Sequence, residues 1–256
     1  MGLKNKEMLG IVVQARLGSK RLPNKMLLPF YENKGVLELL IENLINNFDN
    51  IPLIIATTTS SGDDGIVSLC DKYNVNCYRG SENNVLHRFI EVGEKFELTK
   101  IIRVCADNPF LSMDYIETLM NEFLISDLDY ISFKTVDDIP VIRTHFGFWT
   151  EGVTLKALKK IQSNTSELIY LEHVTNYIYR NENDFKIKFF QIDTSITEHR
   201  NIRMTLDTKE DFVLLKEIYK AYSFQENKNI KSLLNLVEGN EDWKIKMNQQ
   251  IVKNEK

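Results

Sequence analysis

The sequence predicts an α/β protein built on a doubly wound, mostly parallel sheet of the Rossmann type with an antiparallel insertion. Three observations indicate this fold. Short, β-rich apolar runs alternate with longer segments of helical period through the first half of the chain. These runs are continuously apolar, which is typical of parallel strands that are covered on both faces. In the second half the regular alternation gives way to a mixed pattern, which favours antiparallel additions.

The elements of the first half follow the strand–helix alternation directly. We expect buried strands at 10–14, 53–57, 75–78 and 101–105. We expect helices at 36–48, 63–73, 84–96 and 113–124. Because strand–helix–strand units in one sheet form right-handed crossovers, these four strands are predicted to be parallel.

The second half is expected to extend one edge of this sheet. We predict strands at 130–134, 146–150, 185–192 and 202–206, and helices at 155–161, 168–179, 208–222 and in the stretch after 227. We interpret residues 1–222 as one domain with an insertion at about 128–200, and residues 223–256 as a helical extension. Because such edge additions often contact a partner subunit or cover a bound ligand, a homodimer is expected.

Composition limits the classes of partner. The 256 residues are 43% hydrophobic, enough for one large domain with a sizeable core. The 32 basic and 36 acidic residues give a formal net charge of −4, so neither nucleic acid nor a membrane surface is an expected partner. No apolar run approaches the about 20 residues that span a bilayer, and a cytoplasmic protein is expected. The three cysteines, Cys70, Cys77 and Cys105, show no C-x-x-C spacing, which favours reduced thiols.

The segment 15–25 (ARLGSKRLPNK) is the most informative part of the sequence, because it follows the first strand. Ligands of open α/β sheets bind beyond the carboxyl ends of the strands. Gly18 would let the backbone approach a ligand closely, and Ser19 would add a hydroxyl donor. The segment has four positive charges and no negative one, on Arg16, Lys20, Arg21 and Lys25. In an acidic protein this local excess indicates an anion site, with a solvated basic loop as the alternative.

Four segments, in order along the chain, carry a family resemblance. They are 16–25 (RLGSKRLPNK), 79–88 (RGSENNVLHR), 103–109 (RVCADNP) and 203–211 (RMTLDTKED). They are similar to the patterns R-x-G-S-x-R-L-P-x-K, R-G-S-x-x-D-V-L-x-R, R-x-x-G-D-x-P and R-x-T-V-D-T-P-E-D. The chain therefore resembles the cytidylyltransferases, especially those of spore-coat polysaccharide biosynthesis and the CMP-Kdo synthetases, in which Kdo is the eight-carbon sugar acid of lipopolysaccharide.

The resemblance implies the nucleotide-diphospho-sugar transferase fold, which is GT-A-like, and a magnesium-dependent reaction. CTP would react with a small anionic acceptor, either a sugar acid or a phosphorylated or phosphonate molecule. The products would be a CMP-linked molecule, for surface polysaccharide or glycan biosynthesis, and pyrophosphate. The implied catalytic residues are Arg16, Arg21, Lys25 and Asp107. The implied nucleotide-binding residues are Ala15, Arg16, Gly18, Ser19, Arg21, Lys25, Arg79, Ser81, Arg88 and Asp107.

Two aspartates are candidate ligands for Mg²⁺. Asp107 follows the expected strand 101–105, and Asp207 follows the expected strand 202–206, just before a helix. Both are therefore expected at the carboxyl edge of the sheet beside the basic loop. Carboxylates are the usual ligands of the Mg²⁺ that neutralises a departing pyrophosphate. In the resembled family the matching positions bind the metal, whereas a turn or helix-cap role is the alternative for each residue alone.

The acceptor side is predicted from the segment 143–149 (RTHFGFW). Arg143, His145 and Trp149 are an even number of residues apart, so on a strand they would share one face. That face would offer a cation, a titratable donor and an apolar wall to an anionic acceptor. The segment resembles H-I-G-I-Y of the CMP-Kdo synthetases, and Glu172 belongs to an E-H-V-T match to the spore-coat type. A half-buried strand with a core tryptophan is the alternative.

Two other functions use comparable features. A glycosyltransferase of the same fold would hold its metal with a D-x-D pair, and Asp127 and Asp129 form such a pair. They precede the expected strand 130–134 and so are predicted at the wrong edge of the sheet. A non-catalytic nucleotide-binding regulator would need the phosphate-binding loop without the paired carboxylates.

Overall fold

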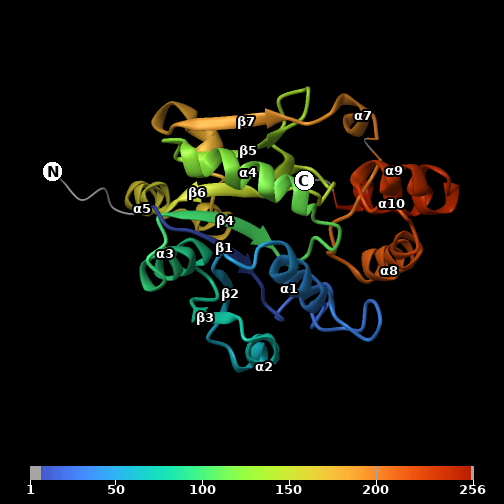
Figure 1. Ribbon diagram of the computed structural model, residues 1–256, viewed down its shortest axis with the longest axis horizontal. Coiled ribbons are helices and arrows are strands. Elements are labelled where there is room, and N and C mark those ends of the chain that lie inside the picture. The colour runs from blue at the N-terminus through green and yellow to red at the C-terminus, as the bar shows by residue number, and fades with distance from the viewer. Residues whose placement is uncertain (1–6, 200, 255–256) are drawn as a thin grey trace.

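The computed structural model describes residues 7–199 and 201–254, and its centre is a seven-stranded sheet with the order β3-β2-β1-β4-β6-β5-β7 (Figure 1). The strands are β1 (Leu9–Gln14), β2 (Leu53–Thr58), β3 (Asn76–Gly80), β4 (Lys100–Cys105), β5 (Tyr130–Lys134), β6 (Glu151–Thr154) and β7 (Ile187–Gln191). β1 pairs in parallel with both β2 and β4, and β2 pairs in parallel with β3. β6 is antiparallel to its neighbours β4 and β5, while β7 is parallel to β5. The predicted fold class is therefore confirmed, including the antiparallel addition at one edge.

Helices cover both faces of this sheet. They are α1 (Val36–Asn47), α2 (Asp64–Tyr73), α3 (Val85–Lys95), α4 (Met113–Ile125), α5 (Leu155–Asn164), α6 (Leu168–Glu172), α7 (Thr194–Thr197), α8 (Lys209–Ser223), α9 (Ile230–Glu238) and α10 (Glu241–Lys253). The apolar residues of α1, α4 and α8 lie in one core cluster, and those of α3 and α5 lie in a second cluster. In β1, Ile11 and Val13 belong to the first cluster, whereas Val12 belongs to the second. A strand with apolar contacts on both faces needs a continuous apolar run, which explains the sequence pattern.

The last three helices pack together at one end of the sheet, on the right in Figure 1. A capping box between Thr208 and Asp211 starts α8. α9 and α10 contribute Leu233, Leu234, Val237 and Met247 to the larger core cluster. The expected helical extension is thus packed against the domain, although the boundary at residues 222 and 223 stays a prediction.

Three expected elements differ from the structure. The segment 146–150 is not a strand: Gly147 takes φ +67°, which breaks the extended conformation, and β6 begins only at Glu151. The segment 202–206 is not a strand either, because its amides bond to loops, Met204 N to His145 O at 2.8 Å and Leu206 N to Asp107 O at 2.9 Å. The helix expected at 168–179 ends at Glu172, since Val174 and Thr175 turn into the core.

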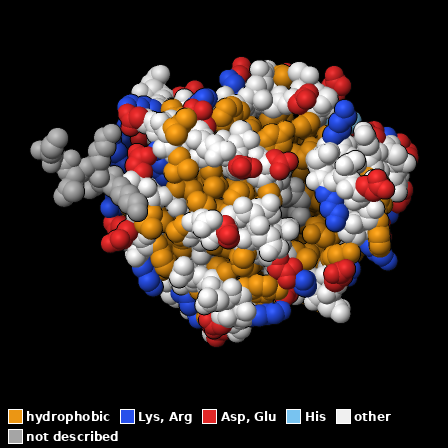
Figure 2. Space-filling model, viewed as in Figure 1, with side chains coloured by type: hydrophobic (Ala, Val, Ile, Leu, Met, Phe, Trp, Pro, Cys, Tyr) orange, Lys and Arg blue, Asp and Glu red, His pale blue; other side chains and the backbone are white. Residues whose placement is uncertain are grey.

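Surface features agree with the composition. Basic and acidic side chains are interspersed over the face in Figure 2. Within residues 7–199 and 201–254, no helix combines the length and the apolarity that crossing a membrane requires. The three cysteines are present as thiols, as expected.

Candidate functional site

A cavity of about 680 Å³ opens at the carboxyl ends of β1 and β4. Gln14 and Cys105, the last residues of these strands, form part of its wall. Arg21, Asp107 and Asp207 also line it. The structure therefore brings together side chains from the basic loop and from both predicted metal segments, at the edge of the sheet where ligands of α/β folds bind.

The basic loop after β1 is held in shape mainly by its own backbone. Ser19 N and Asn24 N both donate to Leu17 O, at 2.8 and 3.1 Å, and Asn24 takes a left-handed φ of 58°. The Ser19 hydroxyl accepts from Leu22 N at 3.4 Å, so it supports the turn. A Cβ on Gly18 would meet its nearest neighbour, Glu82 Oε1, at 3.5 Å, which is an ordinary van der Waals contact and not a clash.

Asp63 anchors this loop to the end of β2, a role that sequence reasoning missed. The buried carboxylate accepts from Leu17 N at 2.7 Å, from Thr57 Oγ1 at 3.0 Å, and from Thr58 N and Oγ1 at 3.2 and 2.5 Å. Burial alone would raise the pKa of Asp63, but these hydrogen bonds outweigh burial and lower it. The anchor therefore depends on an ionised carboxylate.

We expect Asp63→Asn to destabilise the protein near neutral pH by about 1–3 kcal/mol, because a buried acceptor of several hydrogen bonds is lost. The folded pKa of Asp63 is lowered, so its stabilisation is present above the unfolded pKa and is lost as the pH falls through the folded pKa. Urea unfolding at about pH 7 and about pH 3 should show the difference between wild type and variant shrinking in acid. A difference that stays constant with pH would contradict this role.

The two candidate metal ligands lie on either side of one ammonium group. Lys25 Nζ is 3.2 Å from Asp107 Oδ2 and 3.9 Å from Asp207 Oδ1, and it also donates to Leu206 O at 2.5 Å. Arg21 Nη2 lies 3.1 Å from Asp207 Oδ1. Asp207 thus reaches the site although the segment before it is not a strand. Lys25 and Arg21 thus occupy carboxylate oxygens that are expected to bind a metal ion.

Arg203, at the start of the fourth motif, fixes the position of Asp207. Its guanidinium is almost fully buried and bonds Asp207 Oδ2 at 2.9 Å and Asp211 at 2.8 and 2.9 Å. Burial would lower the pKa of Arg203, but the hydrogen bonds and charge of Asp211 and the charge of Asp207 raise it. Nη1 lies 2.6 Å from His145 Nδ1. A permanently charged arginine therefore orients one candidate metal ligand and one candidate acceptor residue.

The residues of the second motif lie outside the wall of the cavity. Arg79 bonds Thr58 O at 2.9 Å, Ser60 O at 2.6 Å and Asp64 Oδ1 at 2.7 Å, so in this state it braces the loop after β2. Ser81 Oγ accepts from Asn84 N at 3.1 Å, and Asn84 in turn caps α3. The side chain of Asn84 therefore caps the helix, as an aspartate at this position would also do.

Arg88 is the most unusual residue of this motif. It is fully buried and donates from Nη1 to Ser81 O at 2.8 Å, while Nε and Nη2 have no hydrogen-bond partner among residues 7–199 and 201–254. Burial, with the charge of Arg16 nearby, lowers the pKa of Arg88 to about 10. Two buried donors without acceptors are costly, and a bound anion is one way to satisfy them.

The predicted acceptor residues are only partly brought together. Arg143, Trp149 and Glu172 line the cavity, and Glu172 Oε1 is 3.7 Å from Arg16 Nη2. His145 is turned toward Arg203 and does not line it. Because 143–149 is not a strand, the expected common face does not exist.

Trp149 is both a wall of the cavity and part of the core. Its side chain is 4% exposed, and its ring packs against Phe148 at 5.5 Å, Tyr115 and Phe146 at 5.7 Å and Phe133 at 6.3 Å between centroids. Most of the Trp149 side chain therefore packs in the core, as the alternative of a core tryptophan expects.

A buried charge network forms another part of the wall, and sequence reasoning assigned it no role. Arg103 Nη1 lies 2.5 Å from Glu151 Oε1, and Nη2 donates to Gln14 Oε1 at 3.0 Å. Glu151 also accepts from Tyr130 Oη at 2.6 Å and from Thr175 Oγ1 at 2.8 Å. Burial would lower the pKa of Arg103, but nearby negative groups, including Glu151, raise it. The third sequence motif includes Arg103 and could have indicated this network, whereas none of the four motifs includes Glu151.

Comparisons with known proteins decide the family. The family model described as "Cytidylyltransferase" matches residues 10–240. The chain belongs to the cytidylyltransferase family. Its relatives include MJ1063 of Methanocaldococcus jannaschii, 35% identical over 90% of both chains, and the spore coat polysaccharide biosynthesis protein SpsF of Bacillus subtilis, 29% identical over 90% of this chain and 94% of that one. A pseudaminic acid cytidylyltransferase of Campylobacter jejuni is 24% identical over 82% of this chain and 95% of that protein.

Solved structures share this fold. A cytidylyltransferase from Leptospira borgpetersenii superposes with a TM-score of 0.78 at 26% identity over 98% of both chains. A CMP-2-keto-3-deoxy-manno-octonic acid synthetase in complex with CTP gives 0.62 at 14% identity, over 84% of this chain and 99% of that one. Rv0371c from Mycobacterium tuberculosis, in complex with manganese, gives 0.55 at 12% identity, over 83% and 99%. This protein is therefore a nucleotidyltransferase with the fold that the sequence predicted.

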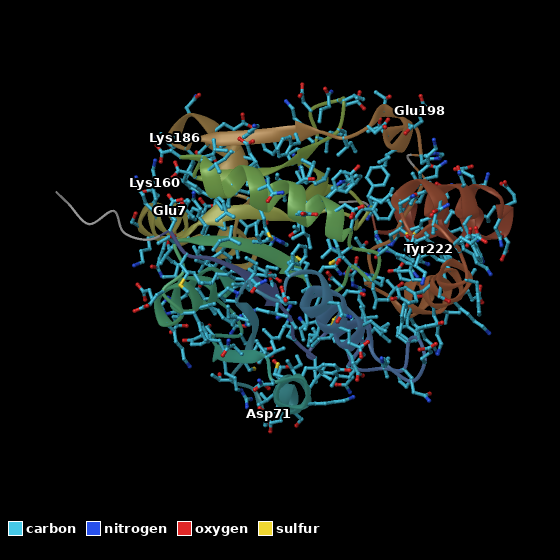
Figure 3. All side chains as sticks on the ribbon, in the orientation of Figure 1. Glu7, Asp71, Lys160, Lys186, Glu198 and Tyr222 are labelled. Carbon is cyan, nitrogen blue, oxygen red and sulfur yellow. The ribbon has the colours of Figure 1, made fainter. Side chains whose placement is uncertain are left out.

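The D-x-D pair of this cytidylyltransferase lies far from the cavity. Asp127 forms an ion pair with Lys186, and Asp129 accepts from Lys186 N at 3.0 Å. Lys186 is labelled in Figure 3 at the opposite end of the sheet from Tyr222 of α8. The pair precedes β5, which runs parallel to β4, so it sits at the amino edge as expected.

Proposed function

We propose that this cytidylyltransferase transfers CMP from CTP to a small anionic acceptor and releases pyrophosphate, with Mg²⁺ as cofactor. The observation that carries the proposal is the arrangement of Arg21, Lys25, Asp107 and Asp207 at the carboxyl edge of the sheet. Three ion pairs with N···O distances of 3.1, 3.9 and 3.2 Å link them in the order Arg21–Asp207–Lys25–Asp107. Such an arrangement suits the charge that a triphosphate brings with its metal.

In this proposal the basic loop holds the triphosphate. Arg21 and Lys25 bind its oxygens and stabilise the charge that develops as pyrophosphate leaves. Arg16 lies close enough to Arg88 to lower its pKa, so the two guanidinium groups together favour an anion beneath the loop. Arg79 and Ser81 of the second motif also bind the nucleotide. In the basic loop, the backbone of Ala15 and Gly18 and the hydroxyl of Ser19 bind it as well.

The donor set fits Mg²⁺. Within the described part of the chain, no group of three or more histidine, cysteine, aspartate or glutamate side chains forms a complete metal site. Mg²⁺ is commonly bound by one or two carboxylates together with substrate phosphates, and Asp107 and Asp207 provide that number. When bound, the ion would neutralise the leaving pyrophosphate, and Lys25 and Arg21 would be released from the carboxylates to the phosphate oxygens.

The acceptor is proposed to be a sugar acid, or a phosphorylated or phosphonate molecule used in surface polysaccharide or glycan biosynthesis. Support comes from the names of SpsF and of the pseudaminic acid cytidylyltransferase, and from Arg143, an exposed cation that lines the cavity. Arg103, which also lines the cavity, is already balanced by Glu151. A sugar-acid hydroxyl must lose a proton to react, whereas a phosphate oxygen is already anionic and needs no base.

The protein is proposed to be a cytoplasmic homodimer. Its domain 1–222 would form the dimer through the insertion at about 128–200. In that insertion, Leu168 is 78% exposed and Ile169 is 43% exposed on α6, beside the cavity. Exposed apolar side chains of this kind are typical of a subunit interface. Sedimentation velocity should give a single species of twice the chain mass, and a monomer at high concentration would contradict the proposal.

For Arg21→Ala we expect CTP binding to weaken about tenfold, as for loss of a charge-assisted hydrogen bond. CMP binding should change little, because CMP lacks the β and γ phosphates to which Arg21 is assigned. Calorimetric titration of both ligands into wild type and variant measures this. Equal weakening of both would place Arg21 elsewhere on the nucleotide.

The product distinguishes this function from its rivals. Incubation with CTP, Mg²⁺ and a panel of sugar acids and phosphorylated sugars should yield a CMP-linked product by mass spectrometry. A glycosyltransferase would instead release a nucleoside diphosphate from a nucleotide sugar, and a regulator would bind the nucleotide without turnover.

A further inference from the structure

The last described helix, α10, reaches the candidate triphosphate site through its C-cap residue. Asn254 lines the same cavity as Arg21, Asp107 and Asp207. Its Oδ1 accepts from Arg21 Nη1 at 3.0 Å. The family model matches residues 10–240, so α10 (Glu241–Lys253) and Asn254 lie beyond the segment by which the family is recognised. A residue outside that segment therefore contacts a central residue of the site.

The side-chain amide of Asn254 is fixed in orientation. Nδ2 donates to Gln250 O at 2.9 Å and lies 3.3 Å from Gln250 Oε1. An amide rotated by half a turn would place its oxygen against these two oxygens and its NH₂ group against the guanidinium, so both interactions would become repulsive. Oδ1 must therefore face Arg21.

α10 is itself tied to the segment that carries Asp207. Met247, 1% exposed, accepts a hydrogen bond through Sδ from Arg203 N at 3.5 Å. One turn later, Gln250 Oε1 accepts from Thr208 Oγ1 at 3.3 Å. These two contacts flank Asp207, so the helix holds Asn254 in a fixed position relative to this candidate metal ligand.

Within the described part of the chain, Arg21 contacts two side chains that differ in charge. Asp207 is an anion, and its Oδ1, 3.1 Å from Arg21 Nη2, is an oxygen that a metal would take. Asn254 is neutral and holds Nη1 without reducing the positive charge of the guanidinium. If Asp207 Oδ1 bound a metal, Arg21 Nη1 could keep its contact with Asn254, and Nη2 would be available to phosphate.

We propose that Asn254 is a positioning residue that keeps the Arg21 guanidinium at the triphosphate site, an inference that rests on the function proposed above. Asn254 acts through Arg21 and makes no other contribution to CTP binding. Without it, the Arg21 side chain, 54% exposed, loses its neutral hydrogen-bond acceptor and samples solvent-exposed rotamers.

The test is a double-mutant cycle with KM for CTP, kcat and thermal unfolding measured on each variant. Asn254→Ala should raise KM for CTP about fivefold, with a smaller change in kcat and an unchanged Tm. In an Arg21→Ala background the same substitution should have no effect, because the residue through which it acts is gone. Asn248→Ala is the matched control, since Asn248 lies on the exposed side of α10, and its KM should equal that of wild type.

The outcomes separate this inference from the function on which it rests. If Arg21→Ala raises KM and Asn254→Ala does not, Asn254 is not a positioning residue, while the proposed role of Arg21 stands. If the effects of the two substitutions simply add, Asn254 acts independently of Arg21 and the inference is overturned. If Arg21→Ala leaves KM unchanged, the phosphate role of Arg21 fails and the inference fails with it.

Discussion

Asp107→Asn is expected to lower kcat at least about 100-fold with little change in fold, because it removes one of two negative charges at the proposed metal site without changing side-chain volume. Asp107 is the better of the two candidate metal ligands for this substitution, because its loss disturbs fewer other contacts. Its side chain is 34% exposed and, among the residues that the structure describes, its ion pair is with Lys25 alone, whereas Asp207 also bonds the buried Arg203. Steady-state pyrophosphate release at increasing Mg²⁺ concentration, with thermal unfolding as the check on folding, gives the answer.

Asp127→Asn provides the matched control for that experiment. Asp127 is exposed, pairs with Lys186, and lies at the amino edge of the sheet. The same chemical change there should leave kcat and the Mg²⁺ requirement as in wild type. If Asp107→Asn retained near-normal turnover at the Mg²⁺ concentration that suits wild type, Asp107 would not be a metal ligand.

Trp149→Ala should lower the free energy of unfolding by about 3–5 kcal/mol, the usual cost of deleting a buried tryptophan side chain. Four aromatic rings surround Trp149, and truncation would leave a cavity between α4 and β5 that they cannot fill. We therefore expect a large fall in Tm, with CTP binding and acceptor use damaged together. Chemical unfolding and CTP titration on the same protein measure this.

Trp149→Phe separates packing from acceptor contact, because it keeps a ring and loses the indole N–H. Stability should fall less than in the alanine variant. A Trp149→Ala protein of near-normal stability that binds CTP and fails only with acceptor would contradict the core role and restore the acceptor role predicted from the sequence.

The sequence predicted those parts of the site that follow strands directly. Asp107 comes two residues after the end of β4 and the basic loop begins where β1 ends, so strand assignment alone brings them to one edge. Asp207 lines the cavity at this edge, but the strand that was expected to bring it there is absent. The segment before it is held by single hydrogen bonds to two loops and not by a sheet, and only the fourth motif indicated its importance.

Contacts between distant segments were not predictable from local patterns. Asp63 holds Leu17, 46 residues away, and Asn254 holds Arg21, 233 residues away. Asp63 resembles any residue before a helix, and Asn254 resembles any polar residue at the end of one. The strand expected at 146–150 failed because Gly147 adopts positive φ in the middle of an otherwise extended, apolar stretch. A motif containing glycine allows this conformation and does not require it.

Pyrophosphate release in the presence of CTP, UTP, ATP or GTP, each with a panel of sugar acids and phosphorylated sugars, tests whether this enzyme transfers CMP to an anionic acceptor. We expect release with CTP far above the other nucleotides, only when an anionic acceptor and Mg²⁺ are both present, and loss of the signal on chelation. Acceptor-dependent release with another nucleotide in preference to CTP, or no release with any acceptor while nucleotide sugars are cleaved, would contradict it.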